Sequence, residues 1–66
     1  MYTNGQALTK DTHFSDHIGL DIPIQVYLSN HHNDIGFVQE VSPEYVKIND
    51  SFFRRDQFQF VSRPGY

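Results

Sequence analysis

The chain has 66 residues, no cysteine and a formal net charge of −3, from five Lys and Arg against eight Asp and Glu. A chain this short forms at most one domain, buries only about 60% of its unfolded surface, and has no disulfide or cysteine-ligated metal to supplement its core. The negative charge argues against a general polyanion binder. With no apolar run long enough to span a bilayer and no signal-peptide pattern, we expect no membrane partner and a cytoplasmic location.

The charges are unevenly distributed along the chain. Residues 1–44 contain one cation and six carboxylates, whereas residues 45–66 contain four cations and two carboxylates. The sequence therefore leaves room for a local basic patch in the C-terminal third, even though the whole chain is acidic.

The first residues of the chain carry little to bury. Residues 1–11 are mostly polar and include Gly5, with only Tyr2, Ala7 and Leu8 to bury, so we expect a flexible N-terminal arm. Residues 12–66 are then expected to form a single small domain.

A short helix is expected at the start of this domain, over residues 12–19. Thr12 is a usable N-cap, Phe14 and Ile18 share one face, and Gly19 suits the C-terminal end. Two turns are too few to be stable alone, so the helix is expected to lay Phe14 and Ile18 on a sheet.

Five short strands are expected after the helix. Alternating apolar residues predict the first strand over 22–29, and a polar turn at 30–34 follows it. Val46 and Ile48 are expected to point inward from the third strand. The remaining strands are expected at 35–41, 45–48, 52–55 and 58–61, with turns at 42–44, 49–51 and 56–57.

The second strand, 35–41, organises the expected fold. Val38 and Val41 cannot share a face at a period of two, so burying both requires a bend or bulge near Gln39 and Glu40. Strands bent in this way let a very short chain wrap one sheet into a barrel. The expected fold is mostly β: a small five-stranded, strongly bent SH3-like or Sm-like barrel preceded by a short N-terminal helix.

Three segments resemble the bacterial Sm-like (Hfq-type) RNA chaperone family. Ile22-Pro23-Ile24-Gln25-Val26-Tyr27-Leu28 is similar to the family's first strand, residues 36–49 to its bent second and third strands, and Ser62-Arg63-Pro64 to its ending. The likeness spans roughly residues 12–64, and most of these positions are ones that any small barrel fills with Gly or apolar residues.

This resemblance implies a ring of subunits joined by pairing of the fourth and fifth strands, with RNA at the pore. Tyr45 matches a position where the family places a base-stacking aromatic residue. The family's Tyr-Lys-His-Ala signature falls on Phe53-Arg54-Arg55-Asp56, which keeps an aromatic residue followed by a cation but adds the negative charge of Asp56.

The best nucleic-acid candidates lie in the C-terminal third, where cations alternate with aromatic residues. Single-strand binders combine such cations for phosphates with rings for stacking bases. In the alternative interpretation, Phe52 or Phe53 belongs to the core and the arginines are charges on an edge strand. The candidate RNA-binding residues are Tyr45, Lys47, Phe53, Arg54, Arg55 and Arg63.

The four histidines form two pairs. His13 and His17 share a helix face at i, i+4, which can ligate a divalent metal, but a closed zinc site needs about four ligands. His31 and His32 are adjacent in the expected turn and would point apart. We expect no metal site and no cofactor.

No enzyme motif is present in the sequence. It has no cysteine nucleophile, no Gly-rich phosphate loop, no His-Glu-x-x-His and no Gly-x-Ser-x-Gly. A chain with so little interior can hardly build a dry, preorganised site. We expect neither catalysis nor a small-molecule substrate.

Association with another chain is the remaining class of function. Tyr27, Val61 and Tyr66 are expected to be spare apolar side chains available to an interface. The sequence therefore favours a non-enzymatic binding or self-assembly module, with a homo-oligomer or a protein as partner. The alternative is a Sm-like protein that binds single-stranded RNA.

Overall fold

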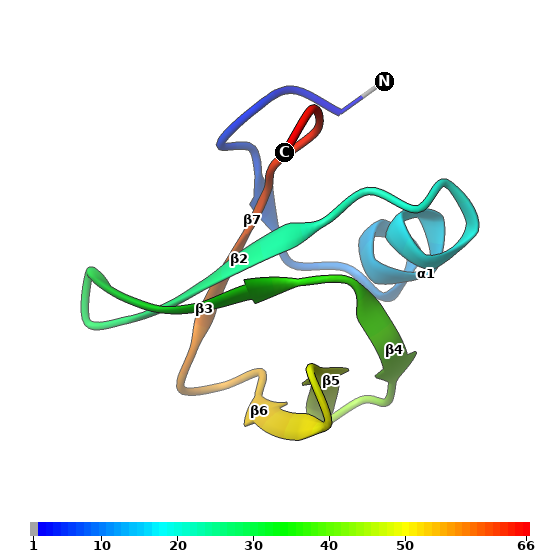
Figure 1. The fold of residues 1–66 in the computed structure, drawn as a ribbon. Coiled ribbons are helices and arrows are strands. Elements are labelled where there is room, and N and C mark those ends of the chain that lie inside the picture. The colour runs from blue at the N-terminus through cyan, green and yellow to red at the C-terminus, as the bar shows by residue number, and fades with distance from the viewer. Residues whose placement is uncertain (1) are drawn as a thin grey trace.

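The computed structural model describes residues 2–66 and shows a mostly β domain with one short helix and two antiparallel sheets (Figure 1). The elements of the described chain, in order, are β1 (Ala7–Leu8), α1 (Asp11–Gly19), β2 (Ile24–Leu28), β3 (His31–Gly36), β4 (Val38–Val41), β5 (Tyr45–Ile48), β6 (Ser51–Arg54) and β7 (Gln59–Ser62). Among these residues, no helix has the length and apolar character needed to cross a membrane.

The strands pair as two separate sheets. The first sheet has the order β1-β7-β2-β3 and the second has the order β4-β5-β6. The chain passes from one to the other between β3 and β4, at Phe37, as the sharp turn of the green ribbon in Figure 1 shows. The described residues therefore form two sheets of four and three strands, rather than one closed barrel of five strands.

The expected irregularity in the second strand is confirmed. Val38 pairs with Ile48 and Glu40 pairs with Lys47, so Gln39 is an extra residue in β4. This bulge brings both Val38 and Val41 toward the core, where Val38 is buried and Val41 packs against the buried cluster. The side chain of Gln39 also accepts a hydrogen bond from the backbone N–H of Asp50, at 2.7 Å, which ties the bulge to the β5–β6 turn.

The prediction of a polar turn over residues 30–34 is wrong in its extent. The β2–β3 turn consists of Ser29 and Asn30, whose φ angles of 51° and 66° suit a two-residue hairpin. The chain from His31 onward belongs to β3. Its first three residues are exposed because this end of the hairpin extends beyond the core, so no apolar alternation marks the strand.

Part of the flexible arm expected over residues 1–11 is instead paired with the first sheet. Met1 lies outside the described residues. β1 forms an antiparallel pair with β7, and Leu8 is buried. The backbone N–H of Gly5 donates to the carbonyl of Ser62 at 2.7 Å. A two-residue strand has too few residues to show a periodic pattern, and it is held by its partner β7.

The helix starts one residue earlier than expected and buries a different pair. Lys10, not Thr12, is the N-cap residue. Phe14 is buried as expected and meets Phe60 edge-on at 5.3 Å between ring centroids. Its buried partner on the helix is His17, whereas Ile18 is 39% exposed.

Residues of both sheets and the helix form one hydrophobic core. Val46 and Ile48 point inward from β5, as expected, and both are fully buried. The buried apolar cluster comprises Leu8, Phe14, Ile24, Val26, Val38, Val46, Ile48, Phe53 and Phe60. These side chains take up the inner faces of the sheets, so polar and aromatic residues on the outer faces are available for contact with other molecules.

Candidate functional site

The outer face of the second sheet gathers aromatic and cationic side chains. Tyr45 on β5 pairs with Arg54 on β6, and Lys47 on β5 pairs with Phe52 on β6. Residues directly opposite each other in an antiparallel ladder project to the same side of the sheet. We call Tyr45, Lys47, Phe52 and Arg54 the aromatic–cationic patch.

The rings and cations of this patch contact one another. The Tyr45 and Phe52 rings meet edge-on at 6.0 Å between centroids. The Lys47 Nζ lies 5.3 Å from the centroid of the Phe52 ring, and the Arg54 Cζ lies 5.9 Å from that of Tyr45. Phe52 is nevertheless 60% exposed and Tyr45 38% exposed. Two rings of this size on a sheet surface form an apolar contact area for another molecule.

Carboxylates compensate both cations of the patch. Lys47 lies 3.6 Å from a carboxylate oxygen of Glu40 on the neighbouring strand. Arg54 donates two hydrogen bonds to Asp56, from Nε at 3.0 Å and from Nη2 at 2.9 Å. This hydrogen-bonded contact lowers the pKa of Asp56 and raises the pKa of Arg54. The surface therefore alternates in sign instead of forming a basic stripe.

Three of the six residues expected to bind nucleic acid share this face: Tyr45, Lys47 and Arg54. Phe53 does not, because it points to the opposite side of β6, is buried, and packs edge-on against Phe58 at 5.2 Å. Its neighbour Phe52 holds the exposed position instead. Sequence alone left the choice between Phe52 and Phe53 open, and the pairing of Val46 with Phe53 decides it.

Arg55 is a structural residue and does not join the patch. Its Nη1 donates to Asp11 at 2.6 Å and to the carbonyl of Ser42 at 2.7 Å, and its Nη2 donates to the carbonyl of Thr9 at 3.2 Å. The guanidinium also lies 4.9 Å from the Phe14 ring centroid. Arg55 thus joins the start of α1 to the β4–β5 turn.

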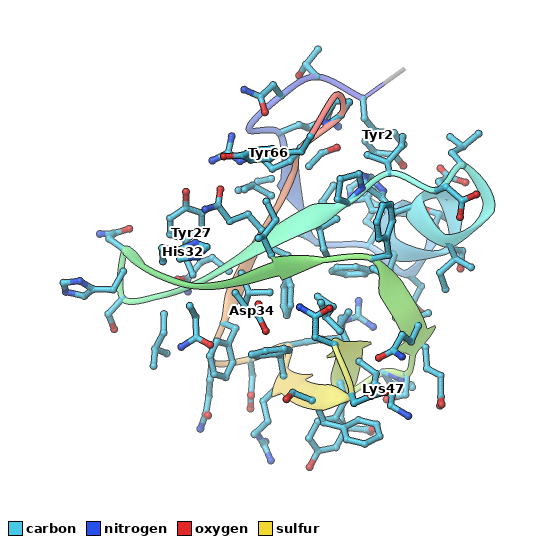
Figure 2. All side chains as sticks on the ribbon, viewed as in Figure 1. Tyr2, Tyr27, His32, Asp34, Lys47 and Tyr66 are labelled. Carbon is cyan, nitrogen blue, oxygen red and sulfur yellow. The ribbon has the colours of Figure 1, made fainter. Side chains whose placement is uncertain are left out.

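The remaining candidates lie on the outer face of the first sheet or beside it. Val61 pairs with Gln25 and with Ala7, so it is flanked on both sides and half-buried. Arg63 donates a hydrogen bond to the hydroxyl of the half-buried Tyr27. Tyr66 is 77% exposed. Figure 2 shows Tyr27 and Tyr66 on one side of the molecule and Lys47 on another.

The histidines are used in local structure. The His13 ring accepts hydrogen bonds from the backbone N–H groups of Thr9 and Lys10 at the start of α1. His17 is buried against Ser62, while His31 and His32 lie on β3. Within residues 2–66, no three His, Asp or Glu side chains gather closely enough to hold a metal ion.

Comparisons with protein-family models, with curated proteins and with solved structures give no match to this chain. Function is therefore inferred from the contacts, charges and exposure of residues on the outer faces of the two sheets.

Proposed function

We propose that this protein is a non-enzymatic module that self-assembles through the aromatic–cationic patch. The observation that carries the proposal is the exposure of Phe52 and Tyr45 beside side chains of both charges. Tyr, Phe and Arg are enriched at protein interfaces, and buried aromatic residues supply much of their binding energy. A chain this small also gains buried apolar area by associating.

A second copy of the chain is the partner that the charges favour. Lys47 and Arg54 stand beside Glu40 and Asp56, so one patch offers both signs to another patch. In a two-fold dimer the same surface meets itself, which requires this kind of self-complementarity. β6 is also an edge strand of the second sheet, and a strand of another chain can pair with such an edge.

We infer that the two sheets are the halves of a small SH3-like or Sm-like barrel. In this interpretation β3 and β4 are one strongly bent strand, as the passage at Phe37 and the bulge at Gln39 suggest. The order of a helix followed by antiparallel strands supports the same assignment. The cysteine-free composition supports a cytoplasmic location for the module.

Light scattering after size exclusion, over a range of protein concentrations, tests self-assembly. The monomer has a mass of 7.7 kDa, and we expect the wild type to exceed it at high concentration. Phe52→Ser should return the mass to that of the monomer. Leu20→Ser is the matched control, since Leu20 is also 60% exposed and lies outside the patch. A wild type that stays monomeric, or a Phe52→Ser variant that still assembles, would contradict the proposal.

Binding of single-stranded RNA is the second candidate. The observation in its favour is that a cation lies beside each exposed ring: Lys47 beside Phe52, and Arg54 beside Tyr45. The ion pairs with Glu40 and Asp56 weigh against it, because phosphate binding needs cations whose charge is not already compensated.

Titration of short RNA oligonucleotides at increasing salt separates the two candidates. An RNA binder should show affinity that falls steeply with salt and is lost in Lys47→Glu/Arg54→Glu. Arg55 is left unchanged in this variant because it is a structural residue. No binding at low salt would remove the RNA candidate.

A further inference from the structure

A hollow of about 560 Å³ lies beside the outer face of the first sheet, remote from the patch. Among the described residues that line it, Arg63 is the only one with a charged side chain; Tyr27, Tyr66, Pro64, Gln25 and Asn4 also line it. Figure 2 shows Tyr66 and Tyr27 one above the other on this side of the molecule. We call this feature the Arg63 hollow.

The Arg63 guanidinium is held in place by three side chains. Its Nε donates to Gln25 Oε1 at 2.6 Å, its Nη1 to Asn4 Oδ1 at 3.2 Å, and its Nη2 to the Tyr27 hydroxyl at 2.9 Å. Gln25 is itself fixed, since Oε1 accepts a hydrogen bond from Tyr27 and Nε2 contacts the His32 ring. A guanidinium oriented in this way loses little side-chain entropy when it binds a ligand.

This arrangement leaves donors for a ligand. A guanidinium has five N–H groups, one on Nε and two on each terminal nitrogen. The three hydrogen bonds use one N–H on each nitrogen, so Nη1 and Nη2 each keep one. Two N–H groups of one guanidinium suit the two oxygens of a carboxylate.

Arg63 takes part in none of the ion pairs found within residues 2–66. Every hydrogen bond of its side chain goes to a neutral oxygen, and the three ion pairs of the described residues involve Lys47, Arg54 and Arg55. A hollow with one cationic side chain, in a chain of net charge −3, favours a ligand with one negative charge over a polyphosphate. The lining is mostly polar, and Tyr27, Tyr66 and Pro64 add a smaller apolar surface beside that cation.

We propose that the Arg63 hollow binds a carboxylate carried beside an aromatic or apolar group. The carboxylate pairs with Nη1 and Nη2 of Arg63, and the apolar group packs on the exposed ring of Tyr66. A free small acid and the last residue of a peptide both supply this chemistry. The site is on the other sheet from the aromatic–cationic patch and does not depend on self-assembly.

Nuclear magnetic resonance titration with N-acetylphenylalanine tests the proposal. We expect saturable shifts of the Arg63 Nε–H and of the Tyr27 and Tyr66 ring signals. N-acetylphenylalanine amide, which lacks the charge, should bind at least tenfold more weakly. 3-Phenylpropionate separates the two sources: equal binding indicates that a free acid suffices, whereas at least tenfold weaker binding indicates that the site reads a peptide end.

Substitutions at Arg63 test whether this residue binds the acid. Arg63→Gln should weaken binding of the acid at least tenfold. Arg63→Lys should recover only part of the lost affinity, because a lysine lacks the planar fork. Arg54→Gln is the matched control on the other sheet and should bind as the wild type does. Because Arg63 is half-buried, Tyr66→Ala gives a second test: this exposed side chain has no place in the core, and its loss should weaken binding while the fold is retained.

Equal affinity for the acid and its amide would overturn the proposal, as would the absence of saturable shifts. Tighter binding of phenyl phosphate than of the acid would also overturn it. Failure here leaves the oligomer mass of the Phe52→Ser variant as an independent measure of the proposed function.

Discussion

His17 and Ser62 form a buried hydrogen bond between α1 and β7, with 2.8 Å between Nε2 and Oγ. The other ring nitrogen of His17, Nδ1, lies 2.6 Å from the carbonyl oxygen of His13, which can only accept a hydrogen. Nδ1 therefore donates, and in the neutral ring Nε2 accepts from the Ser62 hydroxyl. Both residues are at most 1% exposed, so solvent water cannot replace either hydrogen-bond partner.

Removal of this hydroxyl should destabilise the fold. Ser62→Ala leaves Nε2 of His17 buried without a partner, and we expect the free energy of unfolding to fall by about 1–3 kcal/mol. Urea denaturation followed by circular dichroism measures the change. Ser51→Ala, at an exposed strand position, should stay within about 0.5 kcal/mol of the wild type. An equal effect of both substitutions would show that the buried contact contributes nothing.

Arg54 and Arg55 are adjacent in sequence but should differ in their effect on stability. Arg55→Gln removes hydrogen bonds to Asp11, Ser42 and Thr9, and we expect a loss of about 2 kcal/mol. Arg54→Gln removes only an exposed pair with Asp56 and should change stability much less than Arg55→Gln does. Denaturant midpoints of the two variants give the comparison, and a larger loss in Arg54→Gln would reverse these assignments.

The two adjacent phenylalanines, Phe52 and Phe53, should also differ in their contribution to stability. Phe53→Ala opens a cavity in the core, and we expect a loss of about 3–5 kcal/mol. Phe52→Ala removes an exposed ring and its contact with Lys47, for which we expect less than about 1 kcal/mol. Thermal unfolding at a protein concentration low enough to keep the chain monomeric measures both. Similar losses would place both rings in the core.

Gly36 gives room to the side chain of Asn49. A Cβ at position 36 would lie 2.7 Å from Asn49 Oδ1, which forces the amide away from its contacts with Ile35 and Asp34. We expect Gly36→Ala to lower stability by about 1 kcal/mol. In a double-mutant cycle with Asn49→Gly, which keeps the positive φ of that turn, the combined loss should be smaller than the sum. Strict additivity would show that the two residues do not interact.

The pKa of the Tyr2 hydroxyl should lie above the ordinary value for a tyrosine. Its hydrogen bond to Asp16, at 2.7 Å, raises its pKa, and burial and the Asp16 charge act in the same direction. Because the folded pKa is raised, this contact stabilises the fold fully below the unfolded pKa of Tyr2, and the contribution is lost as the pH rises through the folded value. Absorbance titration of the four tyrosines measures the shift. Asp16→Asn should lower the Tyr2 pKa, whereas Asp21→Asn should leave it unchanged.

Local sequence patterns were enough to locate the parts of the fold that depend on nearest neighbours. The conflict between Val38 and Val41 located the bulge at Gln39, and the alternation of Val46 and Ile48 gave the inner face of β5. The two-residue β1 lacked such a signal, because it is too short to alternate and is held by its pairing with β7 and by the burial of Leu8.

The candidate site was only half predictable for the same reason. Tyr45, Lys47 and Arg54 could be grouped from their chemistry, but the exposed ring is Phe52 and not Phe53. Arg55 follows the end of β6, where the chain turns and directs it toward Asp11. Contacts between residues 44 positions apart leave no trace in a local pattern.

The shortness of β1 has a consequence for how this protein aggregates. Only the two residues of β1 and the backbone hydrogen bonds of Gly5 and Gln6 to Ser62 pair this segment with β7, so it should detach at a free energy below that of global unfolding. Detachment uncovers the backbone of β7 and the apolar contacts of Leu8, and an uncovered strand is a template for fibrillar growth. Mild heating or proteolytic nicking ahead of α1 should therefore seed precipitation while most of the native circular dichroism signal persists.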